Sequence, residues 1–320
     1  MDALSDVLRV AHLTGGVFLH ADFFAPWCIA ARVSPEHCAP AVGLASHLIV
    51  YHYVVEGAFR IRVEGESGEG IVIGAGEIVL LPRNDLHLMG NDLNIPPVAG
   101  SDIIRPRKDG GLFTIHHGGA GERTQVICGF LGCGSTKGNP VISTLPPLLK
   151  LDVEQAGAAE WIRSTFQYAA TEVAAGRPGS ETVLAKLSEL LFAETIRRYA
   201  ETLPDAQTGW FAGLREPSVA RALALLHGDV MRRWTVDDLS REVGLSRSAL
   251  ADRFIRLIGA PPMHYLASWR MQVATQKLRN TSASLAQIAQ TVGYDSEAAF
   301  SRAFKKAFGA APATWRRSNS

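Results

Sequence analysis

Residues 284–317 read SLAQIAQTVGYDSEAAFSRAFKKAFGAAPATWRR, and they repeat, with one inserted residue, the pattern of residues 235–266, TVDDLSREVGLSRSALADRFIRLIGAPPMHYL. Equivalent positions hold the same kinds of residue in the pairs Leu239 and Ile288, Val243 and Val292, Gly244 and Gly293, Phe254 and Phe304, Gly259 and Gly309, and Pro262 and Pro312. Two copies indicate a tandem pair of motifs and not a solenoid, which needs three or more repeats.

Each copy has the residue order of a helix-turn-helix: an amphipathic helix, a glycine that can adopt a left-handed turn, a polar N-cap and a second helix. The pattern predicts helices over 236–243 and 247–258, the latter capped by Ser246. In the second copy it predicts helices over 285–292 and 297–308, with Asp295 or Ser296 as the cap. A helix over 263–279 would hold the two second helices about one DNA turn apart, at ~1.5 Å rise per residue.

The second helix of each copy is the candidate recognition helix, because its side chains that are not needed for packing can reach base edges in a major groove. The candidate DNA-binding residues are Arg247, Ser248, Ala251, Asp252 and Arg256 in the first copy, and Glu297, Ala298, Ser301, Arg302, Lys305 and Lys306 in the second. Arg302 is the leading candidate for a guanine or phosphate contact, whereas Lys305 and Lys306 suit phosphate. The alternative for any one of them is a solvated helix face.

The charge is distributed unevenly between the two parts of the chain. Residues 216–320 hold 15 Lys and Arg against 8 Asp and Glu, and the remainder holds 17 against 23, although the whole chain of 320 residues has a formal net charge of +1. A basic block beside an acidic one indicates a polyanionic partner for the basic block. We therefore expect double-stranded DNA to bind to the last third of the chain.

The first part of the chain has a β pattern that changes to a helical one. Short apolar runs between His47 and His87 and again at TQVICGFL, separated by glycine-rich turns, predict an antiparallel barrel or sandwich, with residues 88–120 as a long loop. Residues 158–175 and 181–202 have helical periodicity. In the second helix Val183, Leu187, Leu190, Leu191 and Ile196 fall near one face, which suits either a dimer contact or packing within the domain.

Domain boundaries follow from these patterns: a first domain over 1–203, a linker over 204–217 and a DNA-binding domain over 218–320. The start of the chain lacks the apolar core of a secretory signal, and no run of 18 apolar residues exists, so we expect no membrane partner and a cytoplasmic location. The four cysteines, Cys28, Cys38, Cys128 and Cys133, form no C-x-x-C pair, which argues against a zinc knuckle.

The last hundred residues resemble the AraC/XylS family of bacterial transcription regulators through the motif A-x-x-V-G-Y-D-S-x-x-A-F-S-R-A-F-K-K-x-F-G-x-x-P-x-x-W-R, which extends from Ala289 to Arg316. The resemblance implies a sequence-specific, DNA-binding transcription regulator, commonly an activator, with RNA polymerase, a small-molecule effector and a second copy of the chain as partners. Asp252 departs from the basic or amide residue that relatives often carry there, which leaves the base preference open.

In the first domain, His52 with Glu56, followed by Gly76-x5-Pro82-x4-His87-x3-Asn91, resembles the two motifs of the cupin barrel. The whole fold is then α+β, a cupin-like β-barrel followed by helices and by an all-α domain with two helix-turn-helix motifs. Cupin enzymes commonly bind a metal through two histidines two residues apart, a glutamate and a later histidine, but the first position here is Val50. His52, Glu56 and His87 could still hold a metal ion, although the identity of any metal is unknown; alternatively they hydrogen-bond to one another in an effector pocket without a metal, and no cofactor is expected.

Resemblance to AraC-type regulators with an incomplete cupin domain, a group with a reactive-chlorine-sensing member, makes Cys128 a redox candidate, with Cys28 as the nearest second cysteine. A buried, inert thiol is the alternative, because reactive thiols need exposure and a cationic neighbour. Two further hypotheses remain open: a metal-dependent cupin enzyme fused to a DNA-binding domain, and a constitutive regulator whose cupin domain only dimerises. The missing ligand at Val50 argues against the enzyme.

Overall fold

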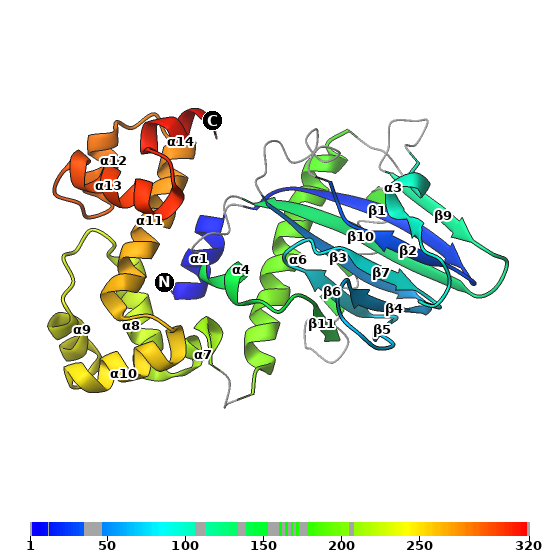
Figure 1. The fold of residues 1–320 in the computed structure, drawn as a ribbon, viewed down its shortest axis with the longest axis horizontal. Helices are drawn as coiled ribbons and strands as arrows, with labels where there is room; N and C mark the ends of the chain where they lie inside the picture. Colours follow the sequence, from blue (N-terminus) through cyan, green and yellow to red (C-terminus); the bar gives the residue numbers. More distant parts are fainter. Residues whose placement is uncertain are drawn as a thin grey trace. The chain divides into compact units, whose positions relative to one another are not determined.

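The computed structural model describes residues 2–11, 13–34, 47–105, 113–133, 139–152, 160–161, 164–165, 168, 171–172, 178–204 and 208–318. Contacts between Cα atoms divide the chain into two units (Figure 1). The β unit comprises residues 13–134 and 145–199, and the helical unit comprises residues 1–12, 135–144 and 200–320. Each unit has its own core.

Two sheets form the β unit. The larger sheet has the strand order β11-β6-β3-β10-β1-β9 and the smaller one the order β5-β4-β7-β2-β8. The strands are β1 (Thr14–Phe24), β2 (Cys28–Ala31), β3 (His47–Glu56), β4 (Ala58–Val63), β5 (Ile71–Gly74), β6 (Glu77–Leu81), β7 (His87–Gly90), β8 (Val98–Ala99), β9 (Thr114–Gly118), β10 (Arg123–Cys133) and β11 (Leu149–Asp152). Neighbouring strands are antiparallel, except that β9 runs parallel to β1 and β8 runs parallel to β2.

The core of the β unit lies between the two sheets. Alternate residues of β3 and β10, including Val50, Val54 and Val126, pack against Phe59 of β4 and Met89 of β7. This period of two is the expected pattern for a sheet with one face in the core. Among the described residues the two sheets share no ladder, so the β unit is a cupin-like sandwich of two sheets and not a closed barrel.

The predicted long loop over 88–120 is wrong in part. Residues 87–90, 98–99 and 114–118 are strands of the two sheets, and α3 (Gly100–Ile103) follows β8, whereas residues 106–112 lie outside the described residues. Pro96 and Pro97 stand directly before β8, so these two prolines belong to a connection between two short strands. The predicted helix over 158–175 lies largely outside the described residues.

Helix α6 (Ser180–Thr202) confirms the second helical prediction, but its apolar face differs from the predicted one. Leu184, Leu191 and Ile196 are buried, whereas Val183 is 38% exposed and Leu190 is 50% exposed. The hydroxyl of Ser188 lies 3.2 Å from that of Tyr51 on β3, so this face of α6 packs on the larger sheet.

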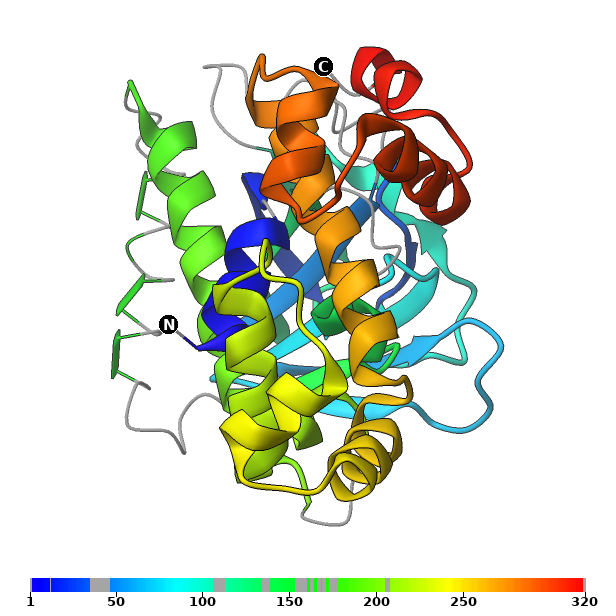
Figure 2. The same ribbon diagram turned by 90° about the vertical axis from the view of Figure 1, so that its left-hand side faces the viewer.

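The helical unit contains the two predicted motifs (Figure 2). Its helices are α1 (Ala3–Ala11), α4 (Pro140–Thr144), α7 (Trp210–Arg215), α8 (Pro217–Gly228), α9 (Val236–Val243), α10 (Arg247–Ile258), α11 (Pro262–Asn280), α12 (Leu285–Thr291), α13 (Glu297–Phe308) and α14 (Pro312–Ser318). In Figure 2 the orange α11 connects the group α8 to α10, coloured yellow-green to gold, with the group α12 to α14, coloured dark orange to red.

Helix α1 belongs to the helical unit by its contacts, although the sequence places it at the start of the predicted first domain, 1–203. Its apolar residues Ala3, Val7 and Ala11 are buried, and α1 packs against α8 and α11. The amide of Gln276 on α11 also donates to the carbonyl oxygen of Arg9 at 3.4 Å. Within the described part of the chain, none of the helices combines the length and the apolar character that crossing a membrane requires.

Candidate DNA-binding surface and internal cavity

Local capping fixes the first helix-turn-helix. Thr235 and Asp238 form a reciprocal capping box at the start of α9, and Gly244 ends that helix in the left-handed region at φ 71°. The hydroxyl of Ser246 then accepts from the backbone N–H of Ala249 at 3.2 Å, as predicted for the cap of α10. Each device satisfies backbone groups that a helix end leaves unpaired.

The second helix-turn-helix uses the same devices. Ser284 and Gln287 form the capping box of α12, and Gly293 takes a left-handed conformation at φ 77°. Of the two predicted caps for α13, the hydroxyl of Ser296 accepts from the N–H of Ala299 at 3.2 Å, so Asp295 precedes the cap. The predicted helix over 285–292 ends one residue earlier, at Thr291.

Each recognition helix packs against its core through two apolar residues spaced four positions apart. Leu250 and Phe254 are buried on α10, and Phe300 and Phe304 are buried on α13. The remaining faces point outward: nine of the eleven predicted DNA-binding residues are exposed, and Ala251 and Ser301 are half-buried. The structure thus gathers each predicted set on one helix face. Contact with DNA remains a proposal for each residue.

The two recognition helices differ in their free cations. The guanidinium of Arg247 on α10 lies 3.0 Å from the carboxylate of Asp237 on α9. Within the described ranges, Arg256 is the one cation of α10 without an acidic partner, whereas α13 has three: Arg302, Lys305 and Lys306. Cations that are not paired within the protein are available to phosphate oxygens, which makes α13 the more strongly phosphate-attracting helix.

A junction joins the second motif to the segment that leads into α9. Arg270 on α11 donates to the carbonyl oxygens of Val230 at 3.0 Å and of Arg232 at 2.8 Å. Gly293 lies against this arrangement, since a Cβ atom there would be 2.6 Å from the Arg270 guanidinium and 2.9 Å from the Met231 carbonyl oxygen. Burial lowers the pKa of Arg270.

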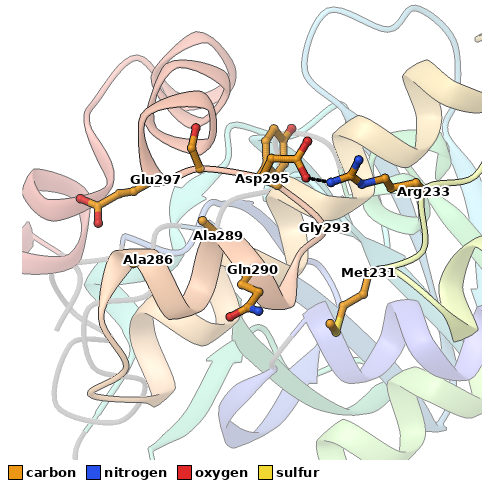
Figure 3. A pocket seen from close by; sticks show the side chains of 10 residues that line it. Met231, Arg233, Ala286, Ala289, Gln290, Gly293, Asp295 and Glu297 are labelled. Carbon is orange, nitrogen blue, oxygen red and sulfur yellow. Dashed lines mark hydrogen bonds and ion pairs between the residues drawn. The ribbon is translucent and has the colours of Figure 1, made fainter.

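An open pocket of about 400 Å³ lies at this junction (Figure 3). Met231 and Arg233 line one side, and Gln290, Asp295 and Glu297 belong to α12, the turn and the start of α13. Arg233 and Asp295 form an ion pair across it, although both side chains are largely exposed. The pocket therefore borders the end of α13 that would enter a DNA groove.

A second cavity, of about 350 Å³, lies inside the β unit. Its wall is mainly apolar and includes Leu19, Phe23, Ile29, Val50, Met89 and Ile115. His52, His87 and Cys128 form its buried polar end, and the other polar side chains in the lining are those of Arg32, Ser34 and Ser101. The sequence comparison with cupins found His52 and His87, and Val50, where cupins carry their first ligand, lines the same cavity.

The polar end is a chain of hydrogen bonds across the two sheets. Cys128 of β10 is the register partner of His52 of β3, and its Sγ lies 3.0 Å from the Nδ1 of His52. The Nε2 of His52 lies 3.1 Å from the Nε2 of His87, whose Nδ1 lies 2.9 Å from the carbonyl oxygen of Asp85. His87 is positioned by the turn before β7, where Asn84 takes φ 53°.

Burial keeps these groups uncharged. Desolvation lowers the pKa of His52 well below its ordinary value, and the neighbouring His87 lowers it further. Desolvation also lowers the pKa of His87 and raises the pKa of the Cys128 thiol to about 12. At neutral pH the chain therefore contains two neutral imidazoles and a thiol.

Glu56 does not join this site, so the predicted set of His52, Glu56 and His87 is wrong. A β-bulge lies between Val54 and Glu56, because these residues pair with the consecutive residues Val126 and Gln125. The Glu56 side chain is 59% exposed, and its carboxylate lies 3.1 Å from the guanidinium of Arg123.

The residues at this site do not fit a cupin metal ion. Val50 offers no ligand atom, and the Cys128 thiol faces the Nδ1 of His52, away from the Nε2 that meets His87. In the described ranges no three His, Cys, Asp or Glu side chains are grouped closely enough to coordinate a metal. We therefore derive no chemistry through a metal here.

The two redox candidates are separate thiols. Cys28, Cys128 and Cys133 are buried thiols, and Cys38 lies outside the described residues. Cys28 lies on β2 and is not among the residues that line the cavity, and desolvation raises the pKa of its thiol. Neither thiol has the exposure of a reactive cysteine, and the effect of Arg62 on the Cys28 thiol is outweighed by burial and by the nearby Asp92, which both raise its pKa.

Sequence reasoning missed Arg233, Arg270 and the apolar cavity wall. The sequence does contain two signals of this contact: Arg270 interrupts an apolar stretch of α11, and Gly293 lies in the turn of the second motif. The contact between them joins residues far apart in the chain, so the local pattern does not predict it. The wall comes from six strands, so no local pattern indicates it.

Two helix-turn-helix motifs on one connecting helix, with exposed basic residues on the recognition helices, define the class: a DNA-binding protein of the helix-turn-helix type. A family model described as Cupin matches residues 2–201, and one described as Helix-turn-helix domain matches residues 239–318.

Relatives over most of the chain have consistent names. A "Putative AraC-like transcription regulator" of Streptomyces lividans is 33% identical over 276 residues, which cover 85% of this chain and 88% of that protein. The "HTH-type transcriptional regulator AlkR" of Acinetobacter baylyi is 28% identical over 99% of both chains. The "RCS-specific HTH-type transcriptional activator RclR" of Escherichia coli is 23% identical over 99% of this chain and 97% of that protein. This chain belongs to the AraC-type transcription regulators with a cupin domain at the N-terminal side.

Solved structures also match its last third. An AraC-type regulator from Chromobacterium violaceum is 28% identical with a TM-score of 0.32, and covers 32% of this chain and 95% of the other. The DNA-binding domain of AdpA in complex with a target DNA is 25% identical with a TM-score of 0.31, and covers 32% of this chain and 91% of that domain.

The membership confirms a transcription regulator that binds DNA.

Proposed function

We propose that this chain is an effector-responsive activator that places α10 and α13 in two adjacent major grooves. The proposal rests on the exposed face of α13, where Arg302, Lys305 and Lys306 have no acidic partner among the described residues. The opposite face of this helix packs into the core through Phe300 and Phe304. Arg302 suits the two acceptors of a guanine edge, and the lysines suit phosphate oxygens.

The two half-sites would differ in sequence. Phe254 and Phe304 are equivalent core positions, so two residues before them Asp252 occupies on α10 the place that Arg302 occupies on α13. A carboxylate accepts from the amino group of cytosine, whereas a guanidinium donates to guanine. We therefore expect an operator without repeat symmetry, in which the half-site under α13 supplies more of the electrostatic affinity.

The cavity of the β unit is the proposed effector site. Its volume falls at the lower end of the ~300–1,000 Å³ that is typical of small-molecule pockets. An effector regulates DNA binding only if it binds one arrangement of the protein more tightly than another. We favour a bound effector over oxidation of Cys128 because that thiol is buried and hydrogen-bonded to a neutral histidine.

The proposed partners are RNA polymerase and a second copy of the chain, and the proposed location is the cytoplasm. Exposed Val183 and Leu190 on α6 support dimerisation through that helix. Catalysis is not proposed, because the named relatives are transcription regulators and the cavity lacks a metal-ligand set among the described residues.

The test is selection of genomic DNA fragments by the purified full-length protein at two salt concentrations. Arg302→Ala would cost about 1–3 kcal/mol and relax the preference at one or two base pairs if Arg302 contacts a base. If it contacts only phosphate, the affinity would fall for all DNA sequences alike. The slope of log affinity against log salt concentration would then decrease in magnitude by about one.

Arg221→Ala is the matched control, because Arg221 is an exposed arginine on α8, outside both recognition helices. The proposal predicts enrichment of one site that spans two major grooves, with little change for this control. Equal losses for both variants, or binding that is indifferent to sequence, would contradict the assignment of α13 as a recognition helix.

A further inference from the structure

The cavity of the β unit has a polar end whose hydrogen-bonding groups are already used. The carbonyl oxygen of Asp85 only accepts, so the Nδ1 of His87 carries the proton and donates. In a neutral imidazole the other nitrogen then accepts, so the Nε2 of His52 donates to the Nε2 of His87. The Nδ1 of His52 in turn accepts from the thiol of Cys128.

This direction of donation leaves no free ring N–H and no free ring lone pair for a ligand. Each of the four imidazole nitrogens has one partner, and the thiol proton is taken by His52. A polar ligand group placed there would lose hydrogen bonds to water without gaining equivalent ones, which costs about 1–3 kcal/mol per group.

The charges around the cavity also favour an uncharged ligand. The ionisable groups at its buried end are His52, His87 and Cys128, all uncharged at neutral pH. Among the described residues that line it, the single Lys or Arg is Arg32, which is exposed to solvent. An anion in the interior would thus lose its hydration without meeting a buried cation.

We infer that the cavity binds an uncharged, predominantly apolar small molecule that packs against the apolar wall without hydrogen bonds to the histidine chain. At ~30 Å³ per non-hydrogen atom, the volume holds roughly a dozen such atoms, the size of a fused pair of rings. This inference rests on the proposed function, which makes the cavity the effector site.

Matched probes test the chemical class. The full-length protein is loaded with the neutral two-ring fluorophore 1-aminonaphthalene, which is then displaced by naphthalene or by 1-naphthoate, two ligands with the same ring system and different charge. We expect naphthalene to bind at least about ten-fold more tightly, because desolvating a carboxylate without a partner costs more than 1.4 kcal/mol. Tighter binding of 1-naphthoate, reversed by Arg32→Ala, would overturn the inference in favour of a carboxylate ligand held at the rim.

Cavity-filling variants locate the probe. Val50→Phe adds a ring inside the cavity and should abolish 1-aminonaphthalene binding, whereas Val72→Phe, at a side chain that is 45% exposed and outside the cavity, should leave it unchanged. Ile115→Phe replaces Val50→Phe if circular dichroism shows that the latter is unfolded. Unchanged binding in a folded, filled variant would place the ligand elsewhere and overturn the inference.

DNA binding by the same samples separates this inference from the proposed function. If naphthalene binds in the cavity but leaves operator affinity and transcription unchanged, the ligand class is confirmed and the effector role of the cavity is wrong. If 1-naphthoate binds more tightly and changes operator affinity, the effector role is confirmed and the ligand class inferred here is wrong.

Discussion

Cys128 is a thiol that the fold keeps protonated. Burial raises its pKa from 9.0 to about 12, and its proton is donated to His52. At pH 8 its thiolate fraction is therefore roughly a thousand-fold below that of an exposed cysteine. The same residue in the unfolded chain has no such protection, which provides an internal control.

We therefore predict slow alkylation of Cys128 in the folded protein. Iodoacetamide at pH 8 should modify it at least about 100-fold more slowly than in the urea-unfolded chain, since the thiolate is the nucleophile. Peptide mass spectrometry after timed quenching measures both rates. Comparable alkylation rates in the folded and unfolded chain would mean that Cys128 is reactive. It would then be a redox candidate again, together with Cys28.

Asp295 places a negative charge directly before the proposed DNA-binding end of α13. It is paired with Arg233 across the open pocket of Figure 3, and both groups are mostly exposed. A phosphate approaching this end would be repelled by Asp295 and attracted by Arg233. The pair therefore holds one favourable cation away from DNA.

We predict that Asp295→Asn strengthens operator binding about two- to five-fold at low salt, with a gain that shrinks as salt rises, because screening weakens exposed charges. Fluorescence anisotropy over a salt series measures this. In Arg233→Ala the same Asp295→Asn change should give a smaller gain. An identical gain in both backgrounds would show that the two residues act independently.

At the scale of elements, Gly244 and Gly293 provide a matched comparison within one chain. They occupy the same position of the two motifs, with φ of 71° and 77°. A Cβ at Gly244 would meet no atom within 4 Å, whereas at Gly293 it would clash with Arg270 and with the Met231 carbonyl. The two motifs thus share the backbone requirement and differ in packing.

We predict that Gly244→Ala costs about 1 kcal/mol of unfolding free energy, the ordinary strain of a left-handed alanine. Gly293→Ala should cost about 1–3 kcal/mol more, because the Arg270 contacts with Val230 and Arg232 must shift. Urea unfolding of both variants tests this. Equal losses of unfolding free energy in the two variants would mean that the Arg270 side chain moves aside without loss of stability.

The elements also show which structure is predictable from sequence. The helix boundaries of both motifs follow from local caps such as Ser246 and Ser296, which act within three residues. The His52 to His87 contact joins two sheets, and the displacement of Glu56 depends on a bulge opposite Gln125. Such contacts are set by strand register, which depends on residues far apart in the chain.

The stability of the whole molecule depends on pH through histidines buried in its cores. In the helical unit, His227 is buried, its ring stacks on Trp269 with centroids 4.1 Å apart, and its Nε2 lies 2.8 Å from the hydroxyl of Tyr265. That hydroxyl accepts from the indole N–H of Trp210 at 2.8 Å, so its own proton goes to His227. The contact therefore requires neutral His227.

Burial lowers the pKa of His227 from 6.5 to about 3. Below pH 6.5 the unfolded chain binds a proton there that the folded chain does not, so this contribution to stability is full above pH 6.5 and is lost progressively toward pH 3. The slope is about 1.4 kcal/mol per pH unit once the unfolded histidine is protonated.

We predict that His227→Gln, which cannot titrate but can still accept from Tyr265, has a shallower loss of unfolding free energy between pH 6.5 and pH 5 than the unsubstituted protein. Urea unfolding followed by tryptophan fluorescence measures both slopes in the full chain, and operator binding at pH 7.5 checks that the variant keeps its fold. A difference of about 1.6 kcal/mol over that interval is expected, because the unfolded histidine is only half protonated at pH 6.5 and the slope reaches its full value at lower pH. Parallel slopes would mean that His227 has the same pKa in the folded and unfolded chains, which would contradict a buried, neutral His227 that accepts from Tyr265.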